Sequence, residues 1–210
     1  MGNSILTLEI LLMKTTSIAA CLVILCAAVQ PAIAHTSVYT TILNGPNEFP
    51  SNPSLGVGSS TVTVDFDLLT MRIQASFSGL TGNTTASHIH GPIPDPPANP
   101  LAGVATPVPS FPGFPLGVQA GSYDQTFDMT SATSYNPAFV TANGGSVGSA
   151  MNAFFAGLDA GKMYLNIHTT NTQGGEIRGF FTLVPEPSTV TLMTLGILLP
   201  VVRRLQRSGR

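Results

Sequence analysis

The sequence has few of the residues that usually cross-link a small domain or carry out its chemistry. Tryptophan is absent, charged residues make up 9% of the chain, and both cysteines, Cys21 and Cys26, lie near the N-terminus. The rest of the chain has no thiol, so it can form no disulfide within itself and cannot use cysteine chemistry. We therefore expect its fold to depend on an apolar core alone.

Cations are scarce between residues 35 and 184. Arg72, Lys162 and Arg178 are the only Lys or Arg residues there, and they stand against eight acidic residues. This balance argues against nucleic-acid binding, which needs clustered positive charge. No Ser-His-Asp order, phosphate-binding loop or pair of glycosidase carboxylates stands out. The sequence thus indicates no class of enzyme.

Residues 1–34 have the features of a signal peptide. Lys14 precedes an apolar run over residues 18–29, and Ala-Ile-Ala at residues 32–34 has the small-x-small pattern that signal peptidase recognises. The run is short for a membrane span, which disfavours a permanent N-terminal anchor. We expect cleavage after residue 34, and both Met1 and Met13 are candidate start residues.

Residues 185–210 form a second terminal signal. Pro185, Glu186 and Pro187 are followed by an apolar run over residues 189–202 and then by four arginines. This arrangement resembles the PEP-CTERM sorting signal, and the resemblance implies processing by an exosortase-type enzyme at the inner membrane. The basic tail would stay on the cytoplasmic side by the positive-inside rule. The short run favours a transient membrane helix, with a permanent single-pass anchor as the alternative.

Between these segments, apolar and polar residues alternate as in half-buried β-strands. Residues 61–67 and 71–78 show the pattern most clearly, and the short turn between them predicts an antiparallel hairpin. Further strands are expected at residues 36–43, 86–90, 121–129, 162–169 and 176–183.

Two segments interrupt the strand pattern. Residues 147–158 have helical spacing, and residues 92–115 contain nine prolines, a density that neither a helix nor a strand interior tolerates. This pattern is typical of an antiparallel β-sandwich or barrel. We predict an all-β fold, an antiparallel β-sandwich that is immunoglobulin-like or superoxide-dismutase-like, with one short helix and a long Pro-rich loop.

Several short motifs follow one another in the order found in a known family. They are Asn44-Gly45, Glu48-Phe49-Pro50, Phe77-Ser78-Gly79-Leu80, His88-Ile89-His90-Gly91, Tyr164 to Thr169, and Gly175-Glu176-Ile177-Arg178-Gly179. Together they resemble the CHRD domain, named after chordin, over residues 35–184, and the Pro-rich loop is longer than in that pattern. The resemblance implies an extracellular β-sandwich without an established catalytic activity. A looser likeness of His-x-His to copper/zinc superoxide dismutases lacks their other motifs.

Three of the four histidines fall in these motifs. His88 and His90 share one face of their strand because side chains alternate, and His168 projects from a later strand on the face opposite its apolar residues. Neutral imidazole is the usual ligand of zinc and copper. Glu176 would be a fourth ligand or a hydrogen-bond acceptor for one of the rings. Alternatively, these are ordinary polar strand residues, with Glu176 and Arg178 forming an ion pair.

We therefore predict an exported structural or binding module at the cell surface or in an extracellular matrix. Its expected partners are signal peptidase, the exosortase-type enzyme and the inner membrane, followed by extracellular polysaccharide or surface proteins. The alternative is a surface metal-binding protein, redox-active or not, that holds copper or zinc with His88, His90 and His168. In either case these histidines should converge with Glu176 and Arg178 in one patch.

Overall fold

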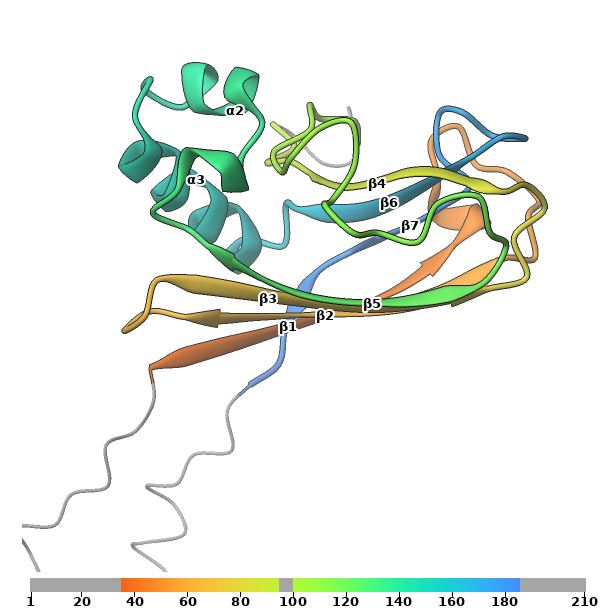
Figure 1. The fold of residues 1–210 in the computed structure, drawn as a ribbon, viewed down its shortest axis with the longest axis horizontal. Helices are drawn as coiled ribbons and strands as arrows, with labels where there is room; N and C mark the ends of the chain where they lie inside the picture. The colour runs from red at the N-terminus through yellow and green to blue at the C-terminus, as the bar shows by residue number, and fades with distance from the viewer. Residues whose placement is uncertain (1–34, 95–99, 186–210) are drawn as a thin grey trace, which may run out of the picture. The chain divides into compact units, whose positions relative to one another are not determined.

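The computed structural model describes residues 35–94 and 100–185 (Figure 1). The predicted signal peptide lies outside these ranges, as does the predicted sorting signal apart from Pro185, which is exposed and in neither a helix nor a strand. Among the described residues, no helix has the length and apolar content needed to cross a membrane.

Eight strands make one continuous antiparallel sheet. They are β1 (Thr36–Asn44), β2 (Val57–Asp65), β3 (Thr70–Ser78), β4 (Thr84–His90), β5 (Gly121–Asp128), β6 (Tyr164–Thr169), β7 (Ile177–Phe180) and β8 (Thr182–Leu183). Their order is β4-β6-β7-β1-β2-β3-β5, and β8 pairs with β1. The predicted hairpin is confirmed, because β2 and β3 pair along their whole length.

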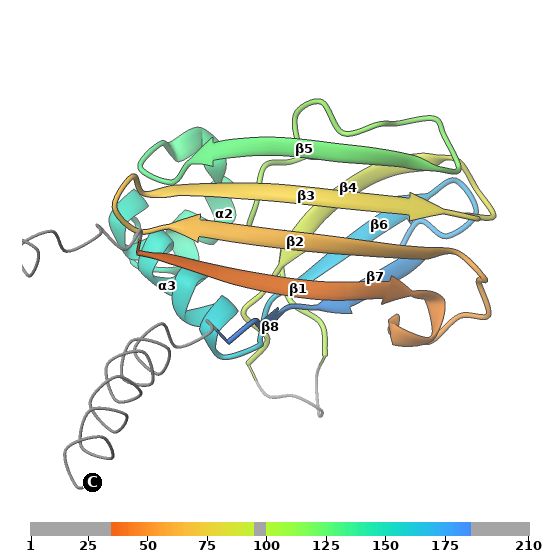
Figure 2. The same cartoon turned by 90° about the horizontal axis from the view of Figure 1, so that it is seen from below.

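The antiparallel all-β architecture is confirmed, but a sandwich of two separate sheets does not form. The single sheet curls into a half-barrel, so that β4, β6 and β7 lie across from β1, β2, β3 and β5 (Figures 1 and 2). The reason is that β1 belongs to both halves. It pairs with β2 over its full length and, at Asn44, with Arg178 of β7.

A glycine allows the two halves to join. A Cβ atom added at Gly179 would collide with the Thr41 side chain and with the backbone carbonyl of Ile42. Any larger residue would therefore push β7 away from β1. Close backbone approach of this kind is a common reason for glycine within a strand.

Two α-helices lie at one end of the curled sheet, where one had been predicted (Figure 1). Helix α3 (Val147–Asp159) matches the predicted helical segment and begins with a capping box between Ser146 and Ser149. The additional helix, α2 (Pro137–Ala142), is too short for a readable apolar period, and it starts at a proline after the capping residue Asn136. Two 3₁₀ turns, η1 (Gly45–Asn47) and η2 (Ala132–Ser134), complete the helical elements in the described ranges.

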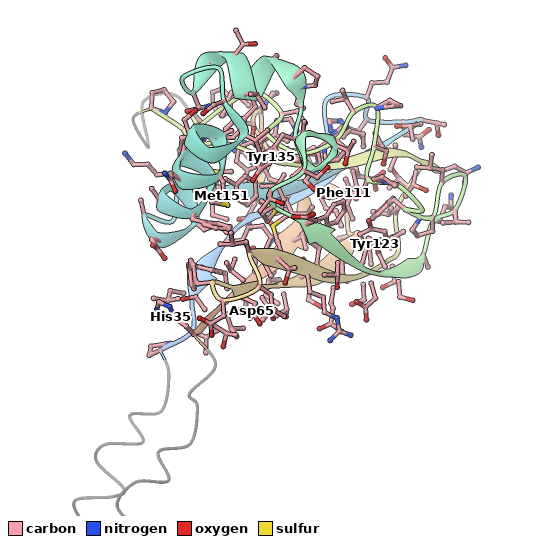
Figure 3. All side chains as sticks on the ribbon, turned by 60° about the vertical axis from the view of Figure 1, so that its left-hand side comes forward. His35, Asp65, Phe111, Tyr123, Tyr135 and Met151 are labelled. Carbon is pink, nitrogen blue, oxygen red and sulfur yellow. The ribbon has the colours of Figure 1, made fainter. Side chains whose placement is uncertain are left out.

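The core fills the inside of the curl. Fully buried members include Val62, Val64, Ile73, Ile89, Phe154, Leu158, Ile167 and Ile177. Phe77 is also buried, whereas Phe66 is only partly buried against the core. Aromatic rings from the Pro-rich loop and β5 join it, with the centroids of Phe111 and Tyr123 5.7 Å apart (Figure 3). Since the isoleucines of β4 and β6 point inward, the histidines of these strands lie on the outer face of the half-barrel.

Candidate metal centre

The three motif histidines meet on the outer face of two neighbouring strands. β4 pairs with β6, and the register places His168 opposite Ala86, two residues before His88. The ring centroid of His88 lies 5.6 Å from that of His90 and 5.2 Å from that of His168. One ring nitrogen from each histidine lies within 4.8 Å of the other two. The structure thus brings together three residues from distant parts of the chain, and we call them the histidine cluster.

Each ring of the histidine cluster uses one nitrogen for a hydrogen bond to a backbone carbonyl. The bonds run from His88 Nε2 to Pro109 (2.6 Å), from His90 Nδ1 to Ala102 (2.9 Å) and from His168 Nδ1 to Gln173 (2.8 Å). A carbonyl oxygen only accepts, so these three nitrogens carry the hydrogen atoms in the neutral rings. The hydrogen bonds therefore determine the tautomer of each ring and leave a lone pair on its other nitrogen.

Those remaining nitrogens are buried and have no hydrogen-bond partner. They are His88 Nδ1, His90 Nε2 and His168 Nε2. Buried polar atoms are nearly always paired in native proteins, so three unpaired ones in a single cluster require an explanation. Lone pairs cannot bond to one another. The arrangement is suited to a cation or a donor molecule held between the rings.

The cluster is also in the protonation state that metal binding requires. Burial lowers the pKa of His90 to about 4, against the opposing effect of its hydrogen bond to Ala102. Burial likewise lowers the pKa of His88 and of His168, and their own carbonyl hydrogen bonds oppose this. All three rings are therefore neutral at pH 7, so a metal ion need not displace protons from their lone pairs.

The described part of the Pro-rich loop runs along the free edge of β4. Ala105 N donates to the carbonyl of Ile89 at 2.9 Å, and Ile89 N donates to Thr106 Oγ1 at 2.9 Å. The loop thereby holds the carbonyls of Ala102 and Pro109 against the rings. The sequence contains no signal for these partners, because any residue has a backbone carbonyl.

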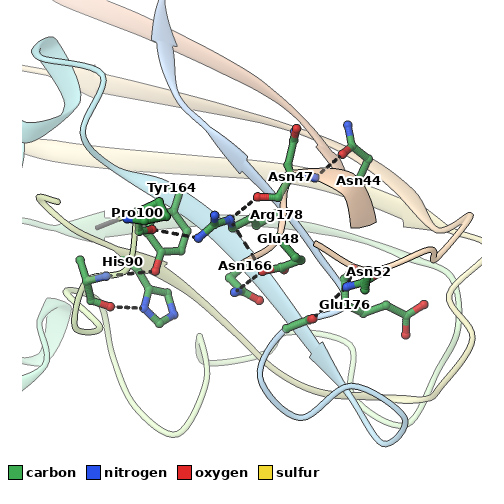
Figure 4. A network of polar contacts seen from close by, with 12 residues as sticks. Asn44, Asn47, Glu48, Asn52, His90, Pro100, Tyr164, Asn166, Glu176 and Arg178 are labelled. Atoms are coloured by element: carbon green, nitrogen blue, oxygen red, sulfur yellow. Dashed lines mark hydrogen bonds and ion pairs between the residues drawn. The ribbon is translucent and has the colours of Figure 1, made fainter. Parts of the chain in front are cut away.

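A second polar group lies beside the cluster on the same outer face (Figure 4). Tyr164 stacks on His90 with ring centroids 5.0 Å apart, and the Arg178 guanidinium lies 4.9 Å from the centre of the Tyr164 ring. Arg178 Nε lies 3.7 Å from Glu48 Oε2, and Nη1 donates to the Pro100 carbonyl at 2.9 Å. We call Glu48 and Arg178 the buried ion pair.

Glu48 was not among the predicted site residues, although it stands in one of the family-like motifs. Its side chain is only 4% exposed, and its Oε1 has no hydrogen-bond partner. Burial raises the pKa of Glu48 to about 7, while Arg178 and the backbone N–H of Phe49 act in the opposite direction. Glu48 thus replaces Glu176 as the ion-pair partner that the i, i+2 spacing predicted for Arg178.

Glu176 is placed among hydrogen-bond donors of neighbouring turns and loops. Its carboxylate accepts from Ser54 Oγ (2.7 Å), Thr81 N (2.6 Å), Gly82 N (3.3 Å) and Thr169 Oγ1 (2.6 Å). Burial alone would raise the pKa of Glu176, but these hydrogen bonds outweigh it and lower the pKa. The carboxylate therefore ties the 79–83 turn to the end of β6 and makes no hydrogen bond to the histidines.

The comparisons with known proteins agree with the motif order. The model of the CHRD domain family matches residues 39–181. No curated protein and no solved structure matches the chain. The matched range contains the histidine cluster, the buried ion pair and Glu176.

Proposed function

Because the chain belongs to the CHRD domain family, we propose that it is a CHRD module that binds one copper or zinc ion through His88, His90 and His168. The observation that supports this function is the convergence of the three rings: one ring nitrogen of each lies within 4.8 Å of the other two, and each ring has one buried nitrogen without a hydrogen-bond partner. Neutral imidazole suits both metals, and copper would add redox activity.

The alternative, in which these are ordinary polar strand residues, leaves the lone pairs unexplained. If the rings served only to hydrogen-bond with their surroundings, the second nitrogen of each would face a donor. Each carbonyl bond instead leaves the second nitrogen of its ring buried and without a donor. Carbonyl groups that orient a ligating histidine are typical of metal sites.

The proposal places the module outside the inner membrane. The signal-peptide features of residues 1–34 support export, and the likeness of residues 185–210 to a PEP-CTERM signal supports sorting by an exosortase-type enzyme. The final location would then be the cell surface or the extracellular matrix.

Metal analysis of the purified full-length protein tests the proposed function. After incubation with copper or zinc and removal of the excess, we expect about one ion per chain by mass spectrometry of the metal content. His88→Ala, His90→Ala and His168→Ala should each lose it. His35→Ala is the matched control, because His35 is the one histidine outside the cluster and is exposed.

Two outcomes would contradict the metal site. One is the absence of bound metal after incubation with either ion, and the other is an equal loss of metal in His35→Ala. Circular dichroism of each variant must accompany the assay, so that a loss of metal is not confused with a loss of fold.

A further inference from the structure

We infer that a divalent ion in the histidine cluster takes a small inorganic anion from solution as its fourth ligand. This inference rests on the proposed metal site and specifies what else that site binds. It follows from the charges of the groups around the cluster and from the fact that the Glu176 and Glu48 carboxylates interact with other groups.

In the part of the chain that the structure describes, the site has three neutral ligands and no anionic one. Among the described residues, the group that could hold a metal ion consists of the three histidines alone. The Glu176 carboxylate accepts hydrogen bonds from four donors, and Glu48 is engaged with Arg178. Zinc in proteins is almost always bound by at least four ligands, so an ion held by these three histidines alone would take its fourth from solution.

The groups behind the ligands are neutral as well. In many metal sites a carboxylate accepts the N–H of a ligating histidine and so supplies negative charge close to the ion. Here all three acceptors are backbone carbonyls, those of Ala102, Pro109 and Gln173. Neither the ligands nor their hydrogen-bond partners would offset the two positive charges of the ion.

The nearest formal charge on this face raises the need for an anion. Arg178 lies against the Tyr164 ring, which in turn stacks on His90, so a positive charge stands close to the cluster. Glu48, 3.7 Å from Arg178 Nε, is engaged with this cation and not with the histidines. Partly buried charges are costly unless they are compensated, so a bound divalent ion would favour an anion over a neutral ligand.

The space around the histidine cluster limits the size of a further ligand. The three unpartnered ring nitrogens are buried, although His90 and His168 as residues are partly exposed. A fourth ligand that comes from solution would therefore have to be small. A small monoanion such as azide, cyanate or chloride fits this description in size and charge.

A cobalt-substituted protein provides the test, because Co²⁺ takes the place of zinc and its visible spectrum responds to its ligands. The full-length protein is loaded with Co²⁺ in chloride-free buffer and titrated with sodium azide. We expect a saturable change in the visible bands that corresponds to one azide per metal. A spectrum that stays unchanged at a hundredfold excess of azide would overturn the inference.

Two further measurements separate the possible failures. If the protein takes up no Co²⁺, the proposed metal site itself fails, whereas uptake without an azide response rejects only the anion. Glu48→Gln removes the carboxylate of the neighbouring ion pair while keeping its shape. Its azide-free spectrum should equal that of the wild type, and a changed spectrum would show that Glu48 is the fourth ligand.

Discussion

The histidine cluster and the buried ion pair lie side by side on the outer face of β6 and its neighbours, but they differ in how their buried polar groups are compensated. Burial disfavours the charged form in both, so it lowers the pKa of His90 and raises that of Glu48. The ion pair contains its own counter-charge in Arg178. The three histidines are neutral, and each leaves one buried nitrogen without a hydrogen-bond partner. The ion pair thus contains both of its charges, whereas the cluster contains acceptors without donors, and we propose a metal ion there for that reason.

The two glutamates show the same contrast on a smaller scale. Glu176 accepts four hydrogen bonds and its pKa is lowered, whereas Glu48 has one unpartnered oxygen and a pKa of about 7. Both are deeply buried. At Glu176 the hydrogen-bond donors outweigh the effect of burial on the pKa, whereas at Glu48 burial outweighs the effects of Arg178 and the Phe49 N–H.

The largest effect should come from removing the counter-charge of the ion pair. Arg178→Met keeps an unbranched chain against Tyr164 but removes the counter-charge of Glu48. We expect the free energy of unfolding at pH 8 to fall by about 3–5 kcal/mol, because an uncompensated charge remains buried. Urea denaturation measures it. Arg72→Met, which breaks the exposed pair with Asp124, is the control and should cost much less. Equal losses in the two variants would refute the contrast between the pairs.

A smaller effect concerns the sign of the pH dependence at Glu48. Because its folded pKa of about 7 lies above the ordinary value of 4.5, its contribution to stability is present below pH 4.5 and is lost as the pH rises through 7. Glu48→Gln removes this loss. From pH 4.5 to 8, the variant should gain about 3 kcal/mol in free energy of unfolding relative to the wild type. A constant difference between the two proteins across this range would show that Glu48 does not titrate as described.

The histidine cluster should show the opposite pH dependence. The folded pKa of His90, about 4, lies below the ordinary 6.5, so its contribution is present above pH 6.5 and is lost as the pH falls through 4. Between pH 7 and 4 the metal-free wild type should lose about 2 kcal/mol relative to His90→Gln, a value reduced because the ring is partly exposed. Thermal or urea unfolding at several pH values measures it. If acid instead stabilised the wild type relative to the variant, the lowered pKa would be wrong.

The smallest effect is expected from removing one of the four hydrogen bonds that the Glu176 carboxylate accepts. Ser54→Ala removes one of its four donors and should cost about 1.5 kcal/mol, since a hydrogen bond to a charged group is lost while three others remain. Ser59→Ala, which removes an exposed hydroxyl bonded to Ser76, is the matched control and should change stability very little. Equal effects of the two changes would argue that the Glu176 hydrogen bonds do not stabilise the fold.

The sequence predicted the strands well because their signal is local. Alternation in residues 61–67 and 71–78 corresponds to β2 and β3, and helical spacing located α3 within a residue of its observed end. The six-residue helix α2 was missed because it is too short to show a period. The sandwich was wrong because alternation tells which face is buried but not which strands pair, and β1 turned out to pair on both sides.

The sequence by itself determined that His88 and His90 share a face and that His168 can project in the same way, since side-chain alternation along a strand is a property of the backbone. Only the tertiary structure decided that β4 and β6 are neighbours, that the Pro-rich loop places its carbonyls against the rings, and that Arg178 pairs with Glu48. These contacts join segments that are far apart in the chain, and several of them use backbone atoms that every residue has. No local sequence pattern predicts these contacts, because they form only when the sheet curls and brings the segments together.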